Sequence, residues 1–256
     1  MRKGKKSPDS MSFLEHLDDL RKRILYSAIA VIVAAIPAWF FHEEIFDILA
    51  RPVRQYLPEG EDLAVTTLPE AFMVYLKVSI LTAIIVTSPF IFYQLWKFVA
   101  PGLYQKEKKY VTPFIFFTTI FFCSGVLFGY YIAFPFACSF FLKFSADFKS
   151  VIKVDNYFSL AFMSILGIAL VFELPTLAFF LSQMGLITSR WMIKNFKYAV
   201  LVIFIIAAII TPSADQLNQC ILGFPMLALY GLSILIVSIV EKKAKAGSIE
   251  PLASVS

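Results

Sequence analysis

Charged side chains are scarce in this sequence. Asp, Glu, Lys and Arg together make up 16% of the 256 residues, whereas 59% are apolar. A soluble domain has about 45–50% apolar residues, so this shortage of charge excludes an ordinary water-soluble domain. Glycine occurs only 10 times against 28 phenylalanines, and no fixed-period repeat is visible, which excludes low-complexity and solenoid architectures. The composition predicts an integral membrane protein with one polytopic domain.

Histidine and cysteine are also rare. The two histidines, His16 and His42, do not lie where they could serve a buried serine or cysteine nucleophile, and HExxH and GxSxG are absent. We therefore expect no enzymatic activity. Three widely spaced cysteines without a CxxC pair indicate neither a disulfide framework nor a metal site, so we expect no metal and no cofactor. An arginine ladder and a TVGYG-like filter are missing, which argues against a channel. We also expect no nucleic-acid partner.

Long uncharged runs are the abundant feature. A helix that crosses ~30 Å of hydrocarbon needs about 20 mostly apolar residues, and this length predicts an all-α fold with six transmembrane helices. The predicted crossings are residues 24–42, 74–96, 112–136, 157–181, 198–211 and 219–239. Proline lies within or at the edge of each one. Because proline removes a backbone donor and favours a bend, we expect bent helices that form a concave, curved wall.

Basic residues fall mostly on one side of these predicted spans. The segments before the first span, between the second and third, between the fourth and fifth, and after the sixth hold most of the 23 Lys and Arg. By the positive-inside rule, both termini then face the cytoplasm. We expect a disordered basic tail (residues 1–11), one six-span membrane domain (residues 12–241) and a cytoplasmic C-terminal tail (residues 242–256).

The short N-terminal tail does not resemble a transit peptide. This favours a bacterial cytoplasmic (inner) membrane, although a plastid-encoded protein fits the same pattern.

The stretch SFLEHLDDLRKRI precedes the first predicted span. Its apolar and charged residues alternate with helical periodicity, which predicts an amphipathic helix on the membrane surface. Ser12 and Glu15 have the spacing of a capping box, a structural explanation for Glu15. Asp19 and Arg23 have the spacing of an ion pair along one helix face, so Asp19 also has a structural explanation.

Four short motifs follow one another along the chain: HLDDLRKR, FVAPGLYQKEKK, FELP and TPSADQLNQ. In this order and at this spacing they resemble the TatC family, the largest subunits of the twin-arginine protein translocase. The resemblance covers roughly residues 12–240. It implies a receptor for signal peptides with consecutive arginines, which assembles as a homo-oligomer with the small subunits TatA and TatB in the lipid membrane. Such a receptor exports folded proteins by using the proton-motive force.

The resemblance assigns two acidic side chains to the arginine pair of the signal. The loop acid of the family falls on Glu107, and the helix acid falls on Asp19, where the family pattern has a glutamate. This shorter side chain leaves open whether Asp18 or Glu15 shares the contact. The resemblance also singles out Arg21, Phe98 and, in the first outer loop, Pro52.

Glu173 interrupts the uncharged run of the fourth predicted span. An ionised acid at mid-membrane costs roughly 2.5–3.5 kcal/mol, so such a residue faces a cavity or a polar partner. One interpretation is a neutral acid that is hydrogen-bonded to a neighbouring helix. A second interpretation, favoured by the resemblance, is that Glu173 lines a polar recess in the concave wall, where the signal or a partner helix docks. The alternative function is a proton-coupled small-molecule transporter with Glu173 as its carrier site, but the two halves show no matching interrupted helices.

Two polar residues lie near the outer end of the sixth predicted span. Asp215 and Gln219 could receive a polar residue of a partner helix. Asp215 could equally act as a helix cap.

Overall fold

The structure is a computed structural model that describes residues 13–55, 63–99, 111–144, 152–210 and 216–247. Its elements are α1 (Phe13–Phe40), α2 (His42–Arg54), α3 (Glu70–Val99), α4 (Val111–Phe128), the π-helical segment η3 (Gly129–Ala133), α5 (Phe134–Phe144), α6 (Val154–Val171), α7 (Leu174–Gln183), α8 (Ser189–Lys194), α9 (Phe196–Ile210) and α10 (Gln216–Gly247). Over these ranges the only β pairing is an isolated bridge between Ala64 and Lys153. The predicted all-α fold is confirmed.

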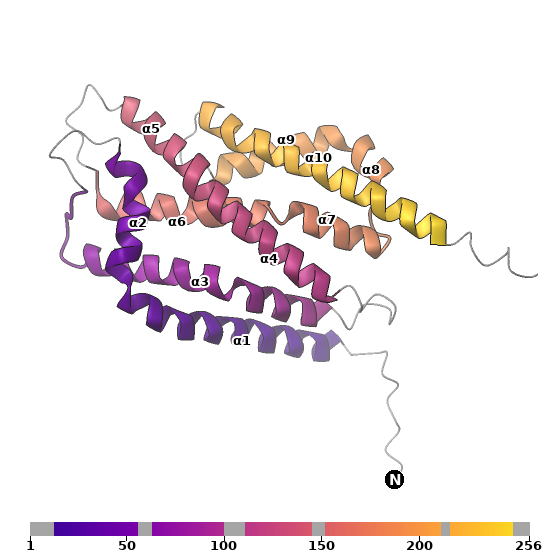
Figure 1. The fold of residues 1–256 in the computed structure, drawn as a ribbon, viewed down its shortest axis with the longest axis horizontal. Helices are drawn as coiled ribbons and strands as arrows, with labels where there is room; N and C mark the ends of the chain where they lie inside the picture. Colours follow the sequence, from indigo (N-terminus) through magenta and orange to yellow (C-terminus); the bar gives the residue numbers. More distant parts are fainter. Residues whose placement is uncertain (1–12, 56–62, 100–110, 145–151, 211–215, 248–256) are drawn as a thin grey trace, which may run out of the picture.

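The long helices lie roughly along the long axis of the molecule (Figure 1). Helix α1 packs on α3, α3 on α6, and α6 on α4, while α7 packs on α10. The beginning of α1, the end of α3 and the end of α10 lie on one side, which we call the termini side (Figure 1). Helix α2 and the beginnings of α3 and α6 lie on the opposite side, the α2 side. The described chain thus begins and ends on one side, as the predicted topology requires.

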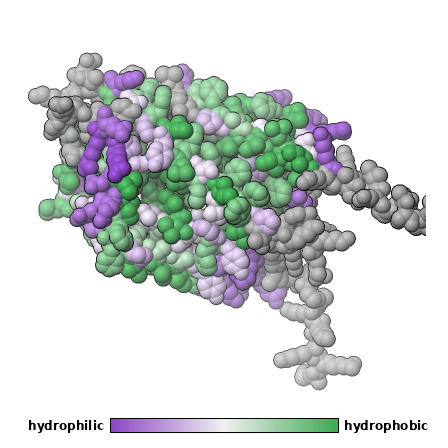
Figure 2. Space-filling view, in the orientation of Figure 1, coloured by the Kyte–Doolittle hydropathy of each residue, from purple (hydrophilic) through white to green (hydrophobic). Residues whose placement is uncertain are grey.

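Five stretches are long and apolar enough to cross a membrane: they lie in α1, α3, α4 through α5, α6 through α7, and α10. Helix α9 is apolar but only 15 residues long. Figure 2 shows hydrophobic side chains over the middle of this face and hydrophilic ones mainly near its two ends. The protein is therefore a multi-pass membrane protein. The number of six crossings and their orientation remain predictions.

The predicted surface helix and the predicted first span form one continuous helix, α1. No glycine or proline lies between Phe13 and Ile36 to interrupt it, which explains why the structure has no turn there. Pro37, inside the same helix, does not end it either. At the other terminus, α10 extends to Gly247, beyond the predicted start of the tail at residue 242. The predicted tail of residues 1–11, and Ser12 of the predicted capping box, lie outside the described residues.

The helix break in the fourth predicted span lies beside Glu173. Helix α6 ends at Val171 and α7 begins at Leu174, with the buried Pro175 in the first turn of α7. In the third predicted span, the π-helical segment η3 separates α4 from α5. These two interruptions are local changes of the backbone of the kind that bends membrane helices.

Two glycines, Gly125 in α4 and Gly129 at the start of η3, let this part of the chain approach α6 closely. A Cβ atom at Gly125 would lie 2.7 Å from the Cα atom of Ala169, and one at Gly129 would lie 3.2 Å from the Cα atom of Ile165. Small residues allow such backbone contact between membrane helices. The largest buried cluster lies nearby, where α2, α3, α5 and α6 meet, and includes Phe134 and Phe158.

Candidate functional site

The termini side brings the start of α1 against the end of α3. The rings of His16 and Phe98 stack with their centroids 4.3 Å apart and their planes at 21°. Phe98 is half-buried, and Arg21, on the same helix as His16, is exposed. The packing of α1 on α3 therefore places Phe98 beside the turn of α1 that precedes Asp19.

Asp19 is held in a chain of hydrogen bonds. Arg23 Nη2 lies 3.1 Å from Asp19 Oδ1, and Arg23 Nε donates to Asp19 Oδ2 at 3.4 Å. Arg23 Nη1 also donates to Oε1 of the buried Gln94 in α3, at 3.2 Å. The side chains of Asp19 and Arg23 are 17% and 18% exposed. The ion pair predicted from the spacing is confirmed, and Gln94 is a partner that sequence reasoning missed.

The second predicted acid, Glu107, lies outside the described residues, as does Asp215. Helix α3 ends at Val99 and α4 begins at Val111, and both of these helix ends lie on the termini side (Figure 1). Whether Glu107 and Asp19 act together remains a prediction.

Glu173 is buried, with 7% of its surface exposed, at the N-cap position of α7. Its Oε1 atom has no hydrogen-bond partner within the part of the chain that the structure describes. An apolar hollow of about 330 Å³ lies between α4, α7 and α10, and Pro175 is one of the residues that line it. Its lining also includes Pro113 and Phe114 from the first turn of α4, on the termini side.

Gln219 is engaged by a neighbouring helix. Its Nε2 donates to the backbone carbonyl oxygen of Phe204 in α9 at 2.8 Å. The amide donor of Gln219 therefore joins α10 to α9 in this structure, which gives the residue a packing role.

Pro52 is buried in the last turn of α2. Proline has no N–H group to bond the carbonyl four residues earlier, here that of Ile48. The Tyr130 hydroxyl donates to that carbonyl oxygen at 2.6 Å, and the Tyr157 hydroxyl donates to the next one, of Leu49, at 2.7 Å. Both tyrosines thus tie α2 to the rest of the molecule, and neither was predicted.

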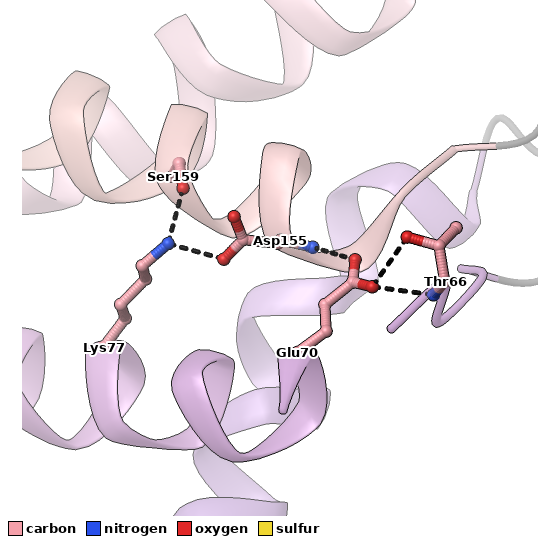
Figure 3. A network of polar contacts seen from close by, with 5 residues as sticks. All are labelled: Thr66, Glu70, Lys77, Asp155 and Ser159. Atoms are coloured by element: carbon pink, nitrogen blue, oxygen red, sulfur yellow. Dashed lines mark hydrogen bonds and ion pairs between the residues drawn. The ribbon is translucent and has the colours of Figure 1, made fainter. Parts of the chain in front are cut away.

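A polar network joins α3 to α6 on the α2 side (Figure 3). Glu70 Oε2 accepts hydrogen bonds from the backbone N–H of Thr66 at 2.6 Å and from its hydroxyl at 2.9 Å. Glu70 Oε1 accepts from the backbone N–H of Asp155 at 3.2 Å. Lys77 Nζ donates to Asp155 Oδ1 and, at 2.8 Å, to the Ser159 hydroxyl. The network fixes the start of α6 to α3.

Glu70 acts as a cap for two segments. Lys153, at the N-cap of α6, forms no side-chain cap, and Glu70 supplies the acceptor for the first turn of α6 instead. Thr67, three residues before Glu70, completes a capping-box pattern, and its N–H donates to Glu70 Oε2 at 3.0 Å. The spacing of Thr67 and Glu70 is visible in the sequence and predicts this cap at the start of α3.

On the termini side, α8 is held by the end of α10. Glu241 Oε1 accepts from the backbone N–H of Ser189 at 2.9 Å, and Glu241 Oε2 accepts from its hydroxyl. The Thr188 hydroxyl caps the same short helix by accepting from the N–H of Trp191 at 3.2 Å. These bonds stabilise the turn between α7 and α9.

Comparisons with known proteins identify relatives of this chain. Residues 15–225 match the family model described as Sec-independent protein translocase protein (TatC). The chain is 42% identical over 236 residues to the TatC protein of Koribacter versatilis, covering 91% of this chain and 87% of the relative. It is 43% identical over 243 residues to the TatC protein of Desulforapulum autotrophicum, covering 94% and 88%.

A solved structure shares the fold. A crystal structure described as the twin arginine translocase receptor TatC superposes with a TM-score of 0.77 at 32% identity, covering 89% of this chain and all of that one. With the family match over most of the chain, these similarities show that this chain belongs to the Sec-independent protein translocase TatC family.

Proposed function

We propose that this chain is the receptor subunit of a twin-arginine translocation system and binds the signal peptides of folded cargo proteins on its termini side. Asp19 and Glu107 bind the guanidinium groups of the arginine pair, and Arg21 and Phe98 belong to the same surface. The observation that carries the proposal is the position of Asp19, which the packing of α1 on α3 holds beside the stacked His16 and Phe98 rings.

Arginine suits such a site because its planar fork can bond a carboxylate twice, whereas lysine is a point charge. Charge-assisted hydrogen bonds contribute on the order of 1.5–3 kcal/mol each, so two contribute about 3–6 kcal/mol. A micromolar complex requires roughly 8 kcal/mol. The apolar part of the signal supplies the remainder when it buries surface at about 25 cal/mol per Å², and the apolar hollow lined by Pro113, Phe114 and Pro175 is a suitable surface.

The remaining assignments belong to the same proposal. The termini side faces the cytoplasm of a bacterium, the protein lies in its inner membrane with six crossings, and several copies assemble with TatA- and TatB-like single-span subunits. Glu173, whose Oε1 has no hydrogen-bond partner among the described residues, contacts a signal or partner helix within the membrane. Gln219 and Asp215 receive a polar residue of a partner helix. Export of folded cargo uses the proton-motive force.

The binding experiment uses the full-length protein in lipid nanodiscs and a fluorescent twin-arginine signal peptide. Because each carboxylate contributes charge-assisted bonds, we expect Asp19→Asn and Glu107→Gln each to raise the Kd about tenfold or more. Asp47→Asn is the matched control, since Asp47 is an exposed acid paired with Arg54 on the α2 side. Equal Kd values for all three variants and the parent protein would refute the proposal.

A further inference from the structure

We propose that the polar pocket between α3 and α6 binds the headgroup of a zwitterionic aminophospholipid, with the phosphate on Lys153 and the ammonium on Asp155. The pocket lies on the α2 side, opposite the surface assigned to the signal peptide. The inference therefore goes beyond the proposed function and does not depend on it.

The pocket has a volume of about 430 Å³ and a balanced set of charges. Glu70 and Lys77 of α3 line it, together with Lys153 at the N-cap of α6 and Asp155 in the first turn of α6. Two ammonium groups and two carboxylates thus face one cavity, and their formal charges sum to zero. A ligand with one positive and one negative group complements this lining better than a lone anion or a lone cation does.

Two of these charged groups can still bind a ligand. Lys153 is exposed, and no described residue forms a hydrogen bond or ion pair with its ammonium group. Asp155 accepts from Lys77 through Oδ1 (Figure 3), while no described residue donates to its Oδ2. Glu70 differs, because it is only 6% exposed and both of its oxygens already accept hydrogen bonds. The pocket therefore offers an ammonium for a phosphate and a carboxylate oxygen for an ammonium.

The position of the pocket favours a lipid over a soluble zwitterion. Its charged lining belongs to the beginnings of two apolar stretches long enough to span a membrane, those of α3 and of α6 through α7. The ends of such stretches lie at the level of the lipid headgroups. Met73 lines the pocket, and it shares an exposed apolar face of α3 with Phe72 and Leu76. Acyl chains can pack along this face while the headgroup occupies the pocket.

The ammonium contact distinguishes the common phospholipids. Phosphatidylethanolamine can donate a charge-assisted hydrogen bond from its primary ammonium to Asp155. Phosphatidylglycerol offers only neutral hydroxyls there, and phosphatidylcholine carries the positive charge without an N–H group. The phosphate is common to all three lipids, so its contact with Lys153 adds to the affinity for each of them without distinguishing them.

The first test is a comparison of lipids on full-length protein in detergent, with binding measured by native mass spectrometry. We expect phosphatidylethanolamine to bind about tenfold more tightly than phosphatidylglycerol. In Asp155→Asn the charge-assisted bond is lost, and the ratio of the two Kd values should fall to about one. Lys77, released by the same change, would attract the phosphate of both lipids and leave the ratio unaffected. Equal Kd values in the parent protein, or a ratio that persists in Asp155→Asn, would overturn the inference.

The second test removes the phosphate contact. We expect Lys153→Gln to raise the Kd of both lipids about fivefold and to keep their ratio. Lys143→Gln is the matched control, because Lys143 is an exposed lysine in the last turn of α5 that does not line the pocket. Unchanged Kd values in Lys153→Gln would contradict the inference. If size-exclusion elution and Tm show that Asp155→Asn does not fold, Lys153→Gln and the lipid comparison on the parent protein decide the matter.

A third measurement separates a lipid from a soluble ligand. Phosphoethanolamine has the same two charged groups but no acyl chains. We expect it to bind at least about tenfold more weakly than phosphatidylethanolamine, because it cannot bury apolar surface against α3. Equal affinity for the two compounds would show that the pocket recognises a soluble zwitterion and would overturn the assignment to a lipid.

Discussion

At the scale of single residues, α2 depends on a hydroxyl from another part of the chain. Pro52 leaves the Ile48 carbonyl without its helical donor, and Tyr130 of η3 supplies the hydrogen bond. The resemblance singled out Pro52 without giving a reason for it. The pairing with Tyr130 explains how a proline is tolerated in the last turn of α2.

The two residues should therefore be coupled energetically. We expect Tyr130→Phe to lower the free energy of unfolding by about 1 kcal/mol, because the Ile48 carbonyl loses its donor. Alanine at position 52 brings back a backbone N–H, so the same Tyr130→Phe change should cost less in a Pro52→Ala background. Chemical unfolding in detergent measures this cycle. Tyr131→Phe, which removes a hydroxyl from the exposed neighbour, is the control, and additive effects of the two changes would contradict the coupling.

Residue spacing predicted some of the site contacts but not others. The Asp19–Arg23 pair was predictable because four residues along a helix place two side chains on one face. The Arg23–Gln94 bond joins positions 71 apart, and the Glu70–Asp155 bond joins positions 85 apart. Such contacts follow from which helices are neighbours, and hydrophobic periodicity does not specify the neighbours.

At the scale of helices, close packing of α4 on the α6–α7 segment depends on Gly125. A Cβ atom there would meet the backbone of Ala169 at 2.7 Å, so one of the helices must shift. We expect Gly125→Ala to lower the free energy of unfolding by about 1–3 kcal/mol, the cost of overpacking a core.

Gly231 in α10 is the matched control for Gly125. Apart from the backbone of its own helix, none of the described residues has an atom within 4 Å of a Cβ atom built at Gly231. Gly231→Ala should therefore leave stability unchanged or raise it by up to about 1 kcal/mol through helix propensity. Thermal unfolding of the two variants in the same detergent compares them. If Gly125→Ala and Gly231→Ala lower the stability equally, the close contact between α4 and α6 at Gly125 does not contribute to stability.

Helix lengths and apolar runs were the most predictable elements. Five predicted spans correspond to stretches long and apolar enough to cross a membrane, and the shortest prediction, residues 198–211, corresponds to the short α9. Helix ends were less predictable, because the hydrophobic run stops at the membrane boundary while the helix continues into polar sequence. The unbroken α1 shows this most clearly, since the amphipathic stretch and the span belong to one helix.

At the scale of the whole molecule, the α2 side and the termini side differ in the polar contacts that join their helices. On the α2 side, Glu70, Lys77 and Asp155 bond α3 to α6 (Figure 3). On the termini side, Arg23 of α1 contacts both Asp19 of α1 and Gln94 of α3, which joins these two helices. Our proposal for the function requires that signal peptides bind on the termini side.

Site-specific photocrosslinking tests this placement most directly. A photoreactive amino acid is introduced at Phe98 on the termini side or at the exposed Val65 on the α2 side, and the membrane-embedded protein is incubated with a labelled twin-arginine signal peptide. We expect crosslinks from position 98 that disappear when excess twin-arginine peptide competes, and none from position 65. Crosslinks from position 65 alone would contradict it.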